Sequence, residues 1–342
     1  MREISIQKNE AGQRMDKFLA KYLNKAPKSF FYKMMRKKNI TLNGKKAVGN
    51  EQLKQGDVIK LFLAEETIEN FIDHSQFSKK KASSARKQTA GKKVQLDILY
   101  EDEAAVFINK PVGMLSQKAS PTDTSLVEYF IDYLLENGKI TEEELHTFHP
   151  SVCNRLDRNT SGIVAAGKTL QALQGLSEMF RDRTLKKYYL CLVKGQVKEN
   201  QRIHGYLVKN EKTNKVTVSQ KKLAEQTKDG KEASAIHTEY KVLARNRETT
   251  LLEVHLITGK THQIRAHLAS IGHPIAGDYK YGNRSFNDAL KKEYGLRSQL
   301  LHAYRLEFPE NCEGDIKQLS GKVIKAPVPA LFEQICKAQG VM

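Results

Sequence analysis

A long acid-free segment constrains the organisation of this chain more than any other feature. Between Ser75 and Gln95 there is no aspartate or glutamate, whereas lysine and arginine recur throughout "SKKKASSARKQTAGKK". Such a segment has nothing to bury and is predicted to be a disordered tether when free. The chain of 342 residues is also too long for one typical core. We therefore expect a small unit over residues 1–64, a basic flexible linker over 65–93 and a larger unit over 94–342.

The overall composition is that of a soluble globular protein, with 39% hydrophobic and 28% charged residues. No apolar run approaches the roughly 18 residues that a membrane helix needs. The first residues, "MREISIQKNEAGQRMDKFL", lack the apolar core of an export signal. The four cysteines stand far apart without a CxxC pair, which excludes a ribbon-type zinc site and disfavours a disulfide framework. We expect a cytoplasmic protein.

The charge of the chain favours a polyanionic partner. Lys+Arg 57 minus Asp+Glu 39 gives a formal net charge of +18. A basic excess suits a polyanion because each phosphate that a protein neutralises releases condensed counterions. The alternative is a soluble protein with a lysine-rich surface. Charge alone does not distinguish nucleic acid from an anionic membrane.

The first unit is predicted to contain two helices and a hairpin. In "RMDKFLAKYL" apolar side chains recur at intervals of three and four, which indicates one helix, and "SFFYKMMRKK" predicts a second helix with a basic end. "ITLNGKKA" alternates around Asn43-Gly44, which is a type I′ hairpin signal. "QGDVIKLFL" supplies a further turn and a closing strand. A unit of about 50 residues has a very small core.

The larger unit mixes strands and helices. "VQLDILYEDEAAVFINKPVGMLS" predicts two strands around an acidic turn, and "TSLVEYFIDYLLENG" an amphipathic helix whose capping box is Ser125 and Glu128. Strands are expected in "GIVAAGK", "KKYYLCLVKG", "IHTEYKVLAR" and "LLEVHLIT", and helices in "TLQALQGLSEMFRDR" and "THQIRAHLASIG". Because there is no regular βα repeat, an α+β fold fits better than a doubly wound sheet.

The stretch "SVCNRLDRNTSGIVAAGKT" carries the strongest candidate for chemistry. It sets Asp157 between Arg155 and Arg158, directly before a turn and an apolar strand. An aspartate between arginines is usually a solvated surface pair that contributes only about 0–1 kcal/mol. Structural ion pairs also perturb carboxylates, so these residues alone favour the structural interpretation.

The run "NRLDRNTSG" resembles the signature of the RluA-type pseudouridine synthases, His-Arg-Leu-Asp-Arg-Asp-Thr-Ser-Gly. Further similar segments follow in the family's order: "LYEDEAAVFINKPVGMLS", "KKYYLCLVKG", "TGKTHQIRAHLASIGHPIAGDYKYG" and "LHAYRLEF". The resemblance covers nearly all of the chain from Val94 on. The first unit resembles the S4 RNA-binding domain, by pattern more than by invariant residues. The combination looks most like the branch that modifies large-subunit ribosomal RNA.

The resemblance implies both a fold and a reaction. The expected catalytic domain is α+β, with a central mixed, largely antiparallel sheet and a cleft, and a small S4-type α/β domain precedes it. In the reaction uridine is detached from its ribose at N1, turned and reattached through C5. Nothing is oxidised or hydrolysed, so no cofactor or metal is expected. The reaction needs an ionised carboxylate, as nucleophile or as stabiliser of positive charge at C1′, and a base for the C5 proton.

The resemblance assigns these roles to three residues. Asp157 matches the family's invariant aspartate, and the basic partner of that aspartate maps to Arg265 in "THQIR". A nearby cation keeps such a carboxylate ionised in a cleft. Tyr189 matches the tyrosine that stacks on the target base and is a candidate for removing the C5 proton, whereas Tyr188 would face the other side of the strand. From the residues alone, a helix-face arginine and a core tyrosine remain the alternatives.

Six further cations are expected to contact RNA. Arg155 aligns with the arginine that enters the RNA stack when the target uridine flips out, since a base inside a helix is out of reach. Simple phosphate binding is the alternative for Arg155. The remaining candidates are Arg158, Lys110, Lys33, Arg36 and Lys37.

Two positions depart from the family signature. Asn154 replaces its histidine and Asn159 its second aspartate. Asparagine still offers a donor and an acceptor, so these changes put the geometry of the loop in question rather than the chemistry. Gly162 is expected where the chain enters the sheet closely. His262 and His267 are five apart, which is not the spacing of a helical zinc pair, so a metal site is disfavoured.

The favoured function is isomerisation of uridines in large-subunit ribosomal RNA, free or within a pre-ribosomal particle, by a monomer that binds no membrane. A synthase acting on transfer RNA and a non-catalytic RNA-binding assembly factor are the alternatives. A base-flipping glycosylase that uses Asp157 to direct water is a further one. Base excision would change the mass of the RNA, whereas isomerisation does not.

Overall fold

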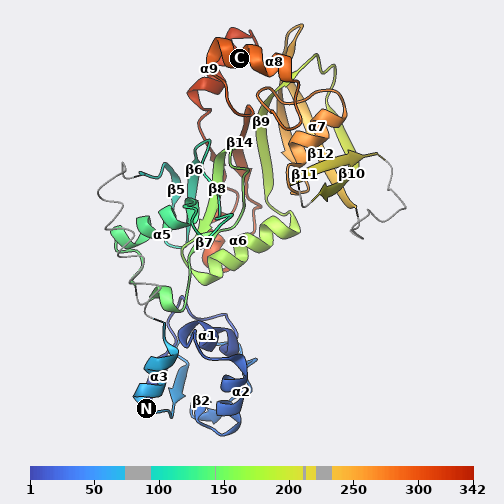
Figure 1. The fold of residues 1–342 in the computed structure, drawn as a ribbon. Coiled ribbons are helices and arrows are strands. Elements are labelled where there is room, and N and C mark those ends of the chain that lie inside the picture. The colour runs from blue at the N-terminus through green and yellow to red at the C-terminus, as the bar shows by residue number, and fades with distance from the viewer. Residues whose placement is uncertain (74–93, 143, 211–212, 221–232) are drawn as a thin grey trace.

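The computed structural model describes residues 1–73, 94–142, 144–210, 213–220 and 233–342. The part of the predicted flexible linker that spans residues 74–93 lies outside them. The described residues form a small N-terminal unit and a larger unit built on one long sheet (Figure 1). None of the helices among these residues is long and apolar enough to cross a membrane.

The N-terminal unit combines three helices with a four-stranded antiparallel sheet of order β1-β4-β2-β3. Its elements are β1 (Arg2–Ser5), α1 (Met15–Tyr22), α2 (Lys28–Arg36), β2 (Ile40–Leu42), β3 (Lys45–Lys46), β4 (Val58–Leu61) and α3 (Glu65–Phe71). The predicted helices and hairpin are confirmed. Asn43 and Gly44 both have positive φ, 49° and 73°, as a type I′ turn requires.

Helix α3 corrects the predicted end of this unit. Residues 65–71 were expected in the linker, but they form a helix. Ile68 and Ile72 are buried in the N-terminal core, and Arg2 on β1 forms ion pairs with Glu65 and Glu69 of the helix. Burial of two isoleucines is enough to fix a segment whose other residues are mostly polar. The described part of this unit therefore reaches residue 73.

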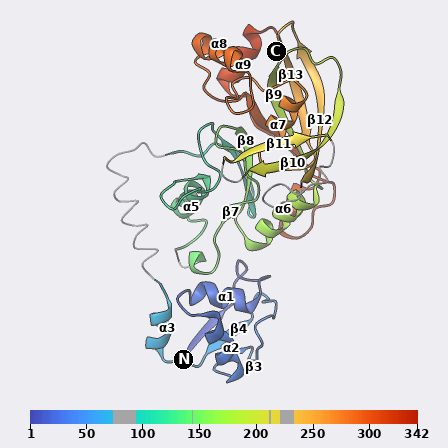
Figure 2. The same cartoon turned by 45° about the vertical axis from the view of Figure 1, so that its right-hand side comes forward.

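The larger unit is an α+β structure around an eleven-stranded sheet. Its elements are β5 (Ile98–Glu101), β6 (Ala105–Lys110), α5 (Leu126–Glu136), η1 (Glu144–His146), β7 (Ser151–Val152), β8 (Ser161–Gly167), α6 (Leu170–Asp182), β9 (Lys186–Lys194), β10 (Gln201–Asn210), β11 (Lys215–Ser219), β12 (Ser234–Arg245), β13 (Thr249–Leu256), α7 (Gln263–Ser270), α8 (Arg284–Tyr294), β14 (Leu301–Glu307), η2 (Gly314–Leu319), β15 (Val323–Lys325) and α9 (Ala330–Ala338). Figure 2 shows helices on both faces of the sheet.

The main path of the sheet has the order β11-β10-β12-β13-β9-β14-β8-β6-β5. Among the described strands the pair β8–β14 is parallel and the other pairs are antiparallel, which confirms the expected mixed, largely antiparallel sheet. Strand β9 lies near its centre and alternates between two cores. Tyr189 and Cys191 face the core that α5 and α7 cover, whereas Leu190 faces the core of α8 and α9.

Strand β14 brings together the two strands that carry the site. It lies between β8 and β9, so that a late segment of the chain joins the two strands that carry the early motifs. Gly162 on β8 makes this close approach possible. It has φ 111°, and a Cβ there would lie 2.1 Å from the backbone oxygen of Ala303 on β14. The expectation that Gly162 enters the sheet closely is confirmed.

Candidate active site

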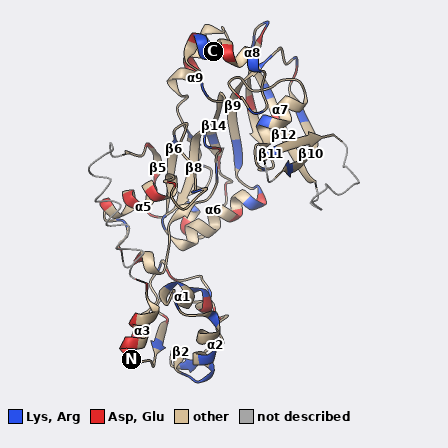
Figure 3. Ribbon diagram, viewed as in Figure 1, with Lys and Arg blue, Asp and Glu red and all other residues tan. Residues whose placement is uncertain are grey.

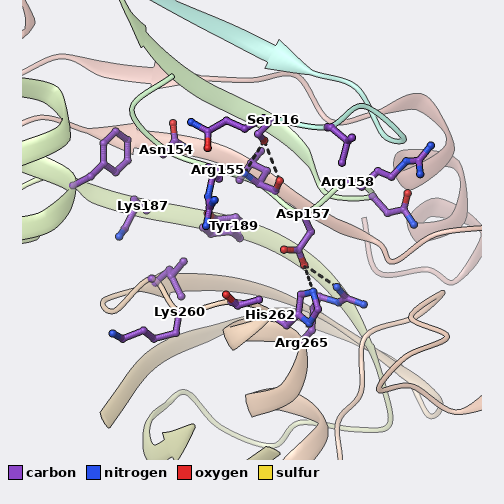
Figure 4. A pocket seen from close by; sticks show the side chains of 18 of the residues that line it. Ser116, Asn154, Arg155, Asp157, Arg158, Lys187, Tyr189, Lys260, His262 and Arg265 are labelled. Carbon is purple, nitrogen blue, oxygen red and sulfur yellow. Dashed lines mark hydrogen bonds and ion pairs between the residues drawn. The ribbon is translucent and has the colours of Figure 1, made fainter. Parts of the chain in front are cut away.

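A cleft of about 870 Å³ opens beside the centre of the sheet. Its walls come from the loop before β8, the start of β9 and the loop that leads into α7, and they bring Asp157, Tyr189 and Arg265 together (Figure 4). Among the described residues that line the cleft, Asp157 is the one carboxylate, whereas lysines and arginines are numerous. The volume is within the range of small-molecule sites, and the lining suits an anionic ligand.

Asp157 and Arg265 form an ion pair across the cleft wall. The Arg265 guanidinium donates from Nη1 to Asp157 Oδ2 at 2.7 Å. Its other edge binds Asp278 in a fork, with Nε to Oδ2 at 2.7 Å and Nη2 to Oδ1 at 3.0 Å. Burial alone would lower the pKa of Arg265, but the hydrogen bonds and charges of the two aspartates outweigh it and raise that pKa. Arg265 is therefore a fixed cation whose charge lies against Asp157.

The fork with Asp278 explains how Arg265 is aimed. Asp278 is 1% exposed, and its Oδ1 also accepts hydrogen bonds from the backbone N–H groups of Lys280 and Tyr281. A planar guanidinium held at one edge by a buried carboxylate has little freedom to turn. Its remaining N–H groups must then point at Asp157, whose side chain is 26% exposed to the cleft.

His262 contributes a second donor beside Asp157. Tyr281 Oη accepts a hydrogen bond from the Val216 N–H at 2.9 Å and lies 2.9 Å from His262 Nδ1. The tyrosine hydroxyl is thus free to donate to Nδ1, which leaves the proton of a neutral imidazole on Nε2, 3.9 Å from Asp157 Oδ2. Burial lowers the pKa of His262, although the charge of Asp157 opposes that shift. The ring is therefore neutral at neutral pH.

Tyr189 lies on the floor of the same cleft. It is 7% exposed, and burial, with the charge of Asp157, raises the pKa of its hydroxyl. The phenol keeps its proton at neutral pH and offers a flat ring to a base. Tyr188 points the other way, as expected, and stacks on His255 with ring centroids 4.8 Å apart.

The two asparagines that depart from the signature differ in role. Asn154 Nδ2 donates to the Ile163 carbonyl, and Asn154 Oδ1 accepts from the Ala165 N–H, so the side chain bonds the loop to β8. Asn159 is exposed on the cleft wall. Ser116 holds the loop from the opposite side, because its Oγ bonds both backbone groups of Leu156 at 3.0 Å.

The residues predicted to contact RNA lie in two places, at the cleft and on α2; Lys110 is the exception. Arg155 and Arg158 are exposed and line the cleft, and Arg158 Nε also donates to the Gly113 carbonyl. Lys33, Arg36 and Lys37 lie on the exposed face and end of α2, in the N-terminal unit and away from the cleft (Figure 3).

The prediction for Lys110 is wrong. It was expected to contact RNA, but it is fully buried, and its ammonium donates to the backbone carbonyls of Pro111, Met114 and Arg158. Burial lowers the pKa of Lys110 to about 8, although the charge of Asp157 opposes the shift. All three donors of the ammonium are used inside the protein. Lys110 holds the loop after β6 against the loop of Asp157.

His267, considered above for a metal site, and His302 both make structural hydrogen bonds. His267 Nδ1 pairs with Thr238 Oγ1, and His302 Nδ1 pairs with Ser161 Oγ, each at 2.9 Å. Both side chains are buried. In the described part of the chain no group of three or more histidine, cysteine, aspartate or glutamate side chains is arranged to hold a metal ion.

Sequence reasoning missed three residues of the site: Asp278, His262 as a neighbour of Asp157, and Lys187. All three lie inside segments that resemble the family, "HPIAGDYKYG", "THQIR" and "KKYYLCLVKG". The resemblance was therefore the available signal. Spacing could not reveal them, because Asp278 and Asp157 meet through Arg265 over more than a hundred positions.

Comparisons with known proteins identify the family. A model of the family described as RNA pseudouridylate synthase matches residues 104–270. The ribosomal large subunit pseudouridine synthase C of Vibrio parahaemolyticus is 33% identical over 335 residues, which cover 97% of this chain and 94% of that protein. The chain belongs to the RNA pseudouridylate synthase family. The protein of the same name from Salmonella typhi is 32% identical over 94% of this chain and 93% of its own length.

A solved structure supports the same assignment for the fold. Human RNA Pseudouridylate Synthase Domain Containing 4 superposes with a TM-score of 0.55 at 25% sequence identity. The match covers 72% of this chain and 94% of the human chain. This protein is thus an RNA pseudouridine synthase, an isomerase, as the resemblance implied.

Proposed function

We propose that this synthase isomerises uridines of large-subunit ribosomal RNA, with Asp157 acting at C1′ of the target nucleotide. The names of the Vibrio and Salmonella relatives, which align over nearly their whole length, support the choice of RNA. The ion pair of Asp157 with Arg265, in a basic cleft of nucleotide size, is the observation that carries the choice of residue.

In the proposed reaction the two carboxylate oxygens of Asp157 have different roles. Arg265 binds Oδ2 of Asp157, and within the described residues no hydrogen bond reaches Oδ1, which is left for the ribose. As the N1–C1′ bond breaks, its electron pair leaves with the uracil, and the carboxylate bonds to C1′ or stabilises the positive charge there. The uracil turns and C5 bonds to C1′; where the carboxylate had bonded to C1′, that bond breaks and its electron pair returns to Asp157. C5 then loses a proton and N1 gains one, so the mass of the RNA is unchanged.

Tyr189 is proposed to hold the uracil while it turns. Its ring is fixed by the core that α5 and α7 cover, so it can stack on a base that lies against Asp157. The hydroxyl keeps its proton at rest, since burial raises the pKa. It therefore receives the C5 proton only as it passes its own proton on, or serves by stacking while another group takes that proton.

RNA binding is proposed to use separate surfaces. Arg155 is exposed at the cleft, and in the described part of the chain no carboxylate pairs with it, which suits an arginine that replaces the flipped uridine in the RNA stack. Arg158 would contact phosphate beside it. The N-terminal unit, in its S4-like arrangement, would hold structured RNA through the cations of α2. The proposed working form is a cytoplasmic monomer, on free RNA or on a pre-ribosomal particle.

Mapping pseudouridines in RNA from cells with and without the gene tests the proposal. We expect one or more large-subunit positions to lose the modification, and to regain it with the wild-type gene but not with Asp157→Asn. Loss confined to transfer RNA would overturn the choice of RNA. No loss anywhere would favour a non-catalytic assembly factor, and a product of lower mass in vitro would indicate a glycosylase.

A further inference from the structure

Two buried lysines flank the site, and they differ in what surrounds their charge. Lys110 is fully buried and donates to three carbonyl oxygens. Lys187 is 8% exposed, lines the cleft, and has neither a hydrogen-bond acceptor nor a carboxylate partner among the described residues. An ammonium taken out of water without a hydrogen-bond acceptor is costly, and the Phe180 ring at 6.0 Å, the outer limit of a cation–π contact, offsets little of that cost. A bound anion would account for the position of Lys187.

Strand geometry aims Lys187 at the same cleft as Tyr189. The two residues are two positions apart on β9, so their side chains leave the same face of the strand, about 7 Å apart. In Figure 4 Lys187 lies to one side of Tyr189 and Asp157 to the other. The Lys187 ammonium lies 6.0 Å from the ring centre of Phe180, and a Cβ on Gly259 would lie 3.7 Å from it.

The surroundings of Lys187 are positively charged. Arg183, in the left-handed conformation that ends α6, lines the same part of the cleft and opposes the charge of Lys187. Lys260 approaches from the loop before α7, and it is exposed. A neutral carbonyl of a base would not offset this mutual repulsion, whereas a phosphate would, and it can accept from all three cations at once.

We propose that Lys187, with Arg183 and Lys260, forms a subsite for one backbone phosphate next to the flipped uridine. The inference rests on the proposed function and adds a ligand to it, because the phosphates on either side of a ribose are the anions closest to that ribose. With the base on Tyr189 and C1′ at Asp157, Lys187 holds the RNA strand at a third point, on the side of Tyr189 away from Asp157. It is a positioning residue for the known reaction.

The subsite has a consequence for pH. Burial, with the positive charge of Arg183, lowers the pKa of Lys187 to about 8 in the free protein. The ammonium is charged below that pH, so its contribution to phosphate binding is present there and is lost as the pH rises; bound phosphate moves the loss to higher pH. The other charged or titratable groups that line the cleft with it are Lys118, Cys153, Arg155, Asp157, Arg158, Arg181, Arg183, Tyr189, Lys260, His262, Arg265 and Lys280.

The first test measures binding of a full-length large-subunit ribosomal RNA transcript as a function of salt, in the Asp157→Asn background that blocks chemistry. Lys187→Met should weaken binding roughly tenfold and reduce the slope of log K against log salt by about one. Lys187→Arg should restore both and remove the weakening above pH 8. Lys186→Met is the matched control, because Lys186 is exposed and leaves the opposite face of β9.

The second test identifies the phosphate. It uses a synthetic stem–loop around a uridine that the mapping experiment finds, with one flanking phosphate at a time made neutral as methylphosphonate. At one of the two positions, neutralising the phosphate should weaken RNA binding by the wild-type protein. The same change should not weaken RNA binding by the Lys187→Met variant any further. If Lys187→Met loses the same factor on every RNA, the phosphate assignment is overturned.

Two further measurements distinguish this inference from its alternatives. Lys187→Met should unfold at the same temperature as the wild type or higher, since it removes an unpaired buried charge; a clear loss of stability would mean that the lysine is structural. Wild-type protein should form pseudouridine in the unmodified stem–loop. If it does not, the proposed RNA target fails, and the salt-slope result for Lys187 is judged separately.

Discussion

Helix α2 of the N-terminal unit and the site of the catalytic unit hold cations in opposite ways. In the N-terminal unit the cations of α2 are exposed, and in the described part of the chain Lys33, Arg36 and Lys37 form no ion pair. In the catalytic unit Arg265 is buried and fixed by two aspartates, and Lys110 by three carbonyls.

This difference separates affinity from chemistry. Exposed cations act on RNA through a field that salt screens, and each contributes little by itself. A buried and paired cation costs desolvation energy but holds one geometry, and that geometry is what a reacting carboxylate needs. We therefore expect changes to Asp157 and to the buried pair that fixes it to alter the rate, and changes on α2 to alter the affinity.

The largest effect is expected for Asp157→Asn. The amide keeps the shape of the side chain but lacks the charge and nucleophilicity that act at C1′, so the single-turnover rate should fall by about 10⁴-fold or more. RNA affinity should stay close to that of the wild type. Pseudouridine formation is followed by mass spectrometry after chemical labelling. A normal rate would exclude Asp157 as the reacting carboxylate.

Tyr189→Phe tests the hydroxyl apart from the ring. If the hydroxyl takes part in proton transfer, the rate should fall by about 10²–10⁴-fold while affinity is kept. Tyr189→Leu should in addition weaken binding by about 1–3 kcal/mol, because the stacking surface is lost. Single-turnover kinetics and RNA titrations give the two readouts. Equal rates for Tyr189→Phe and wild type would limit Tyr189 to stacking.

Asp278→Asn tests whether Arg265 must be aimed. Removing one charge from the fork should turn the guanidinium away from Asp157 and lower the rate by roughly 10²-fold. Breaking a buried pair should also lower the free energy of unfolding by about 3–5 kcal/mol. Urea unfolding and single-turnover rates are measured on the same preparation. A loss of stability at a normal rate would show that Asp278 supports the fold alone.

The smallest effect on rate is expected for α2. Replacing Lys33, Arg36 and Lys37 together by glutamine should weaken RNA binding about tenfold and reduce the salt slope by about two to three. At saturating RNA the rate should be unchanged. Binding is measured by filter retention over a series of salt concentrations. An unchanged salt slope would mean that α2 does not contact RNA.

The matched control for α2 lies on another helix. Arg284, Lys291 and Lys292 are exposed on α8, which belongs to the far end of the catalytic unit (Figure 1). Replacing them by glutamine removes the same charge from the chain. If this change weakens RNA binding as much as the α2 change, the effect is one of net charge and not of a surface on the N-terminal unit.

Local sequence signals predicted local structure well. The capping box of Ser125 and Glu128 is present at the start of α5, and Asn43-Gly44 forms the expected turn. Helix α3 was missed because its apolar side chains are few, so its stability comes from the core that it joins. Lys110 was misassigned because lysine side chains are usually exposed. Its ammonium is buried because it donates to three backbone carbonyls, and no sequence pattern predicts that arrangement.

The site was predictable where a motif names a residue and not where residues meet in space. The Asp157–Arg265 pair followed from the family resemblance, and the structure places the two side chains 2.7 Å apart. The fork of Asp278 and the tautomer of His262 depend on atoms that only the folded chain brings together. Long-range hydrogen bonds leave no periodic trace in a sequence, which is why they were missed.

The insertion of β14 between β8 and β9 sets an order of events during synthesis. The strands that carry Gly162 and Tyr189 are made before Leu301–Glu307. They are joined in the sheet only when that segment pairs with both of them. Until the ribosome has extruded that strand, the nascent chain can fold its N-terminal unit, but β8 and β9 are not yet joined. Such distant pairing slows folding, because a long loop must close before any contact rewards it. The part of the cleft that these strands build would thus form only after β14 has been made.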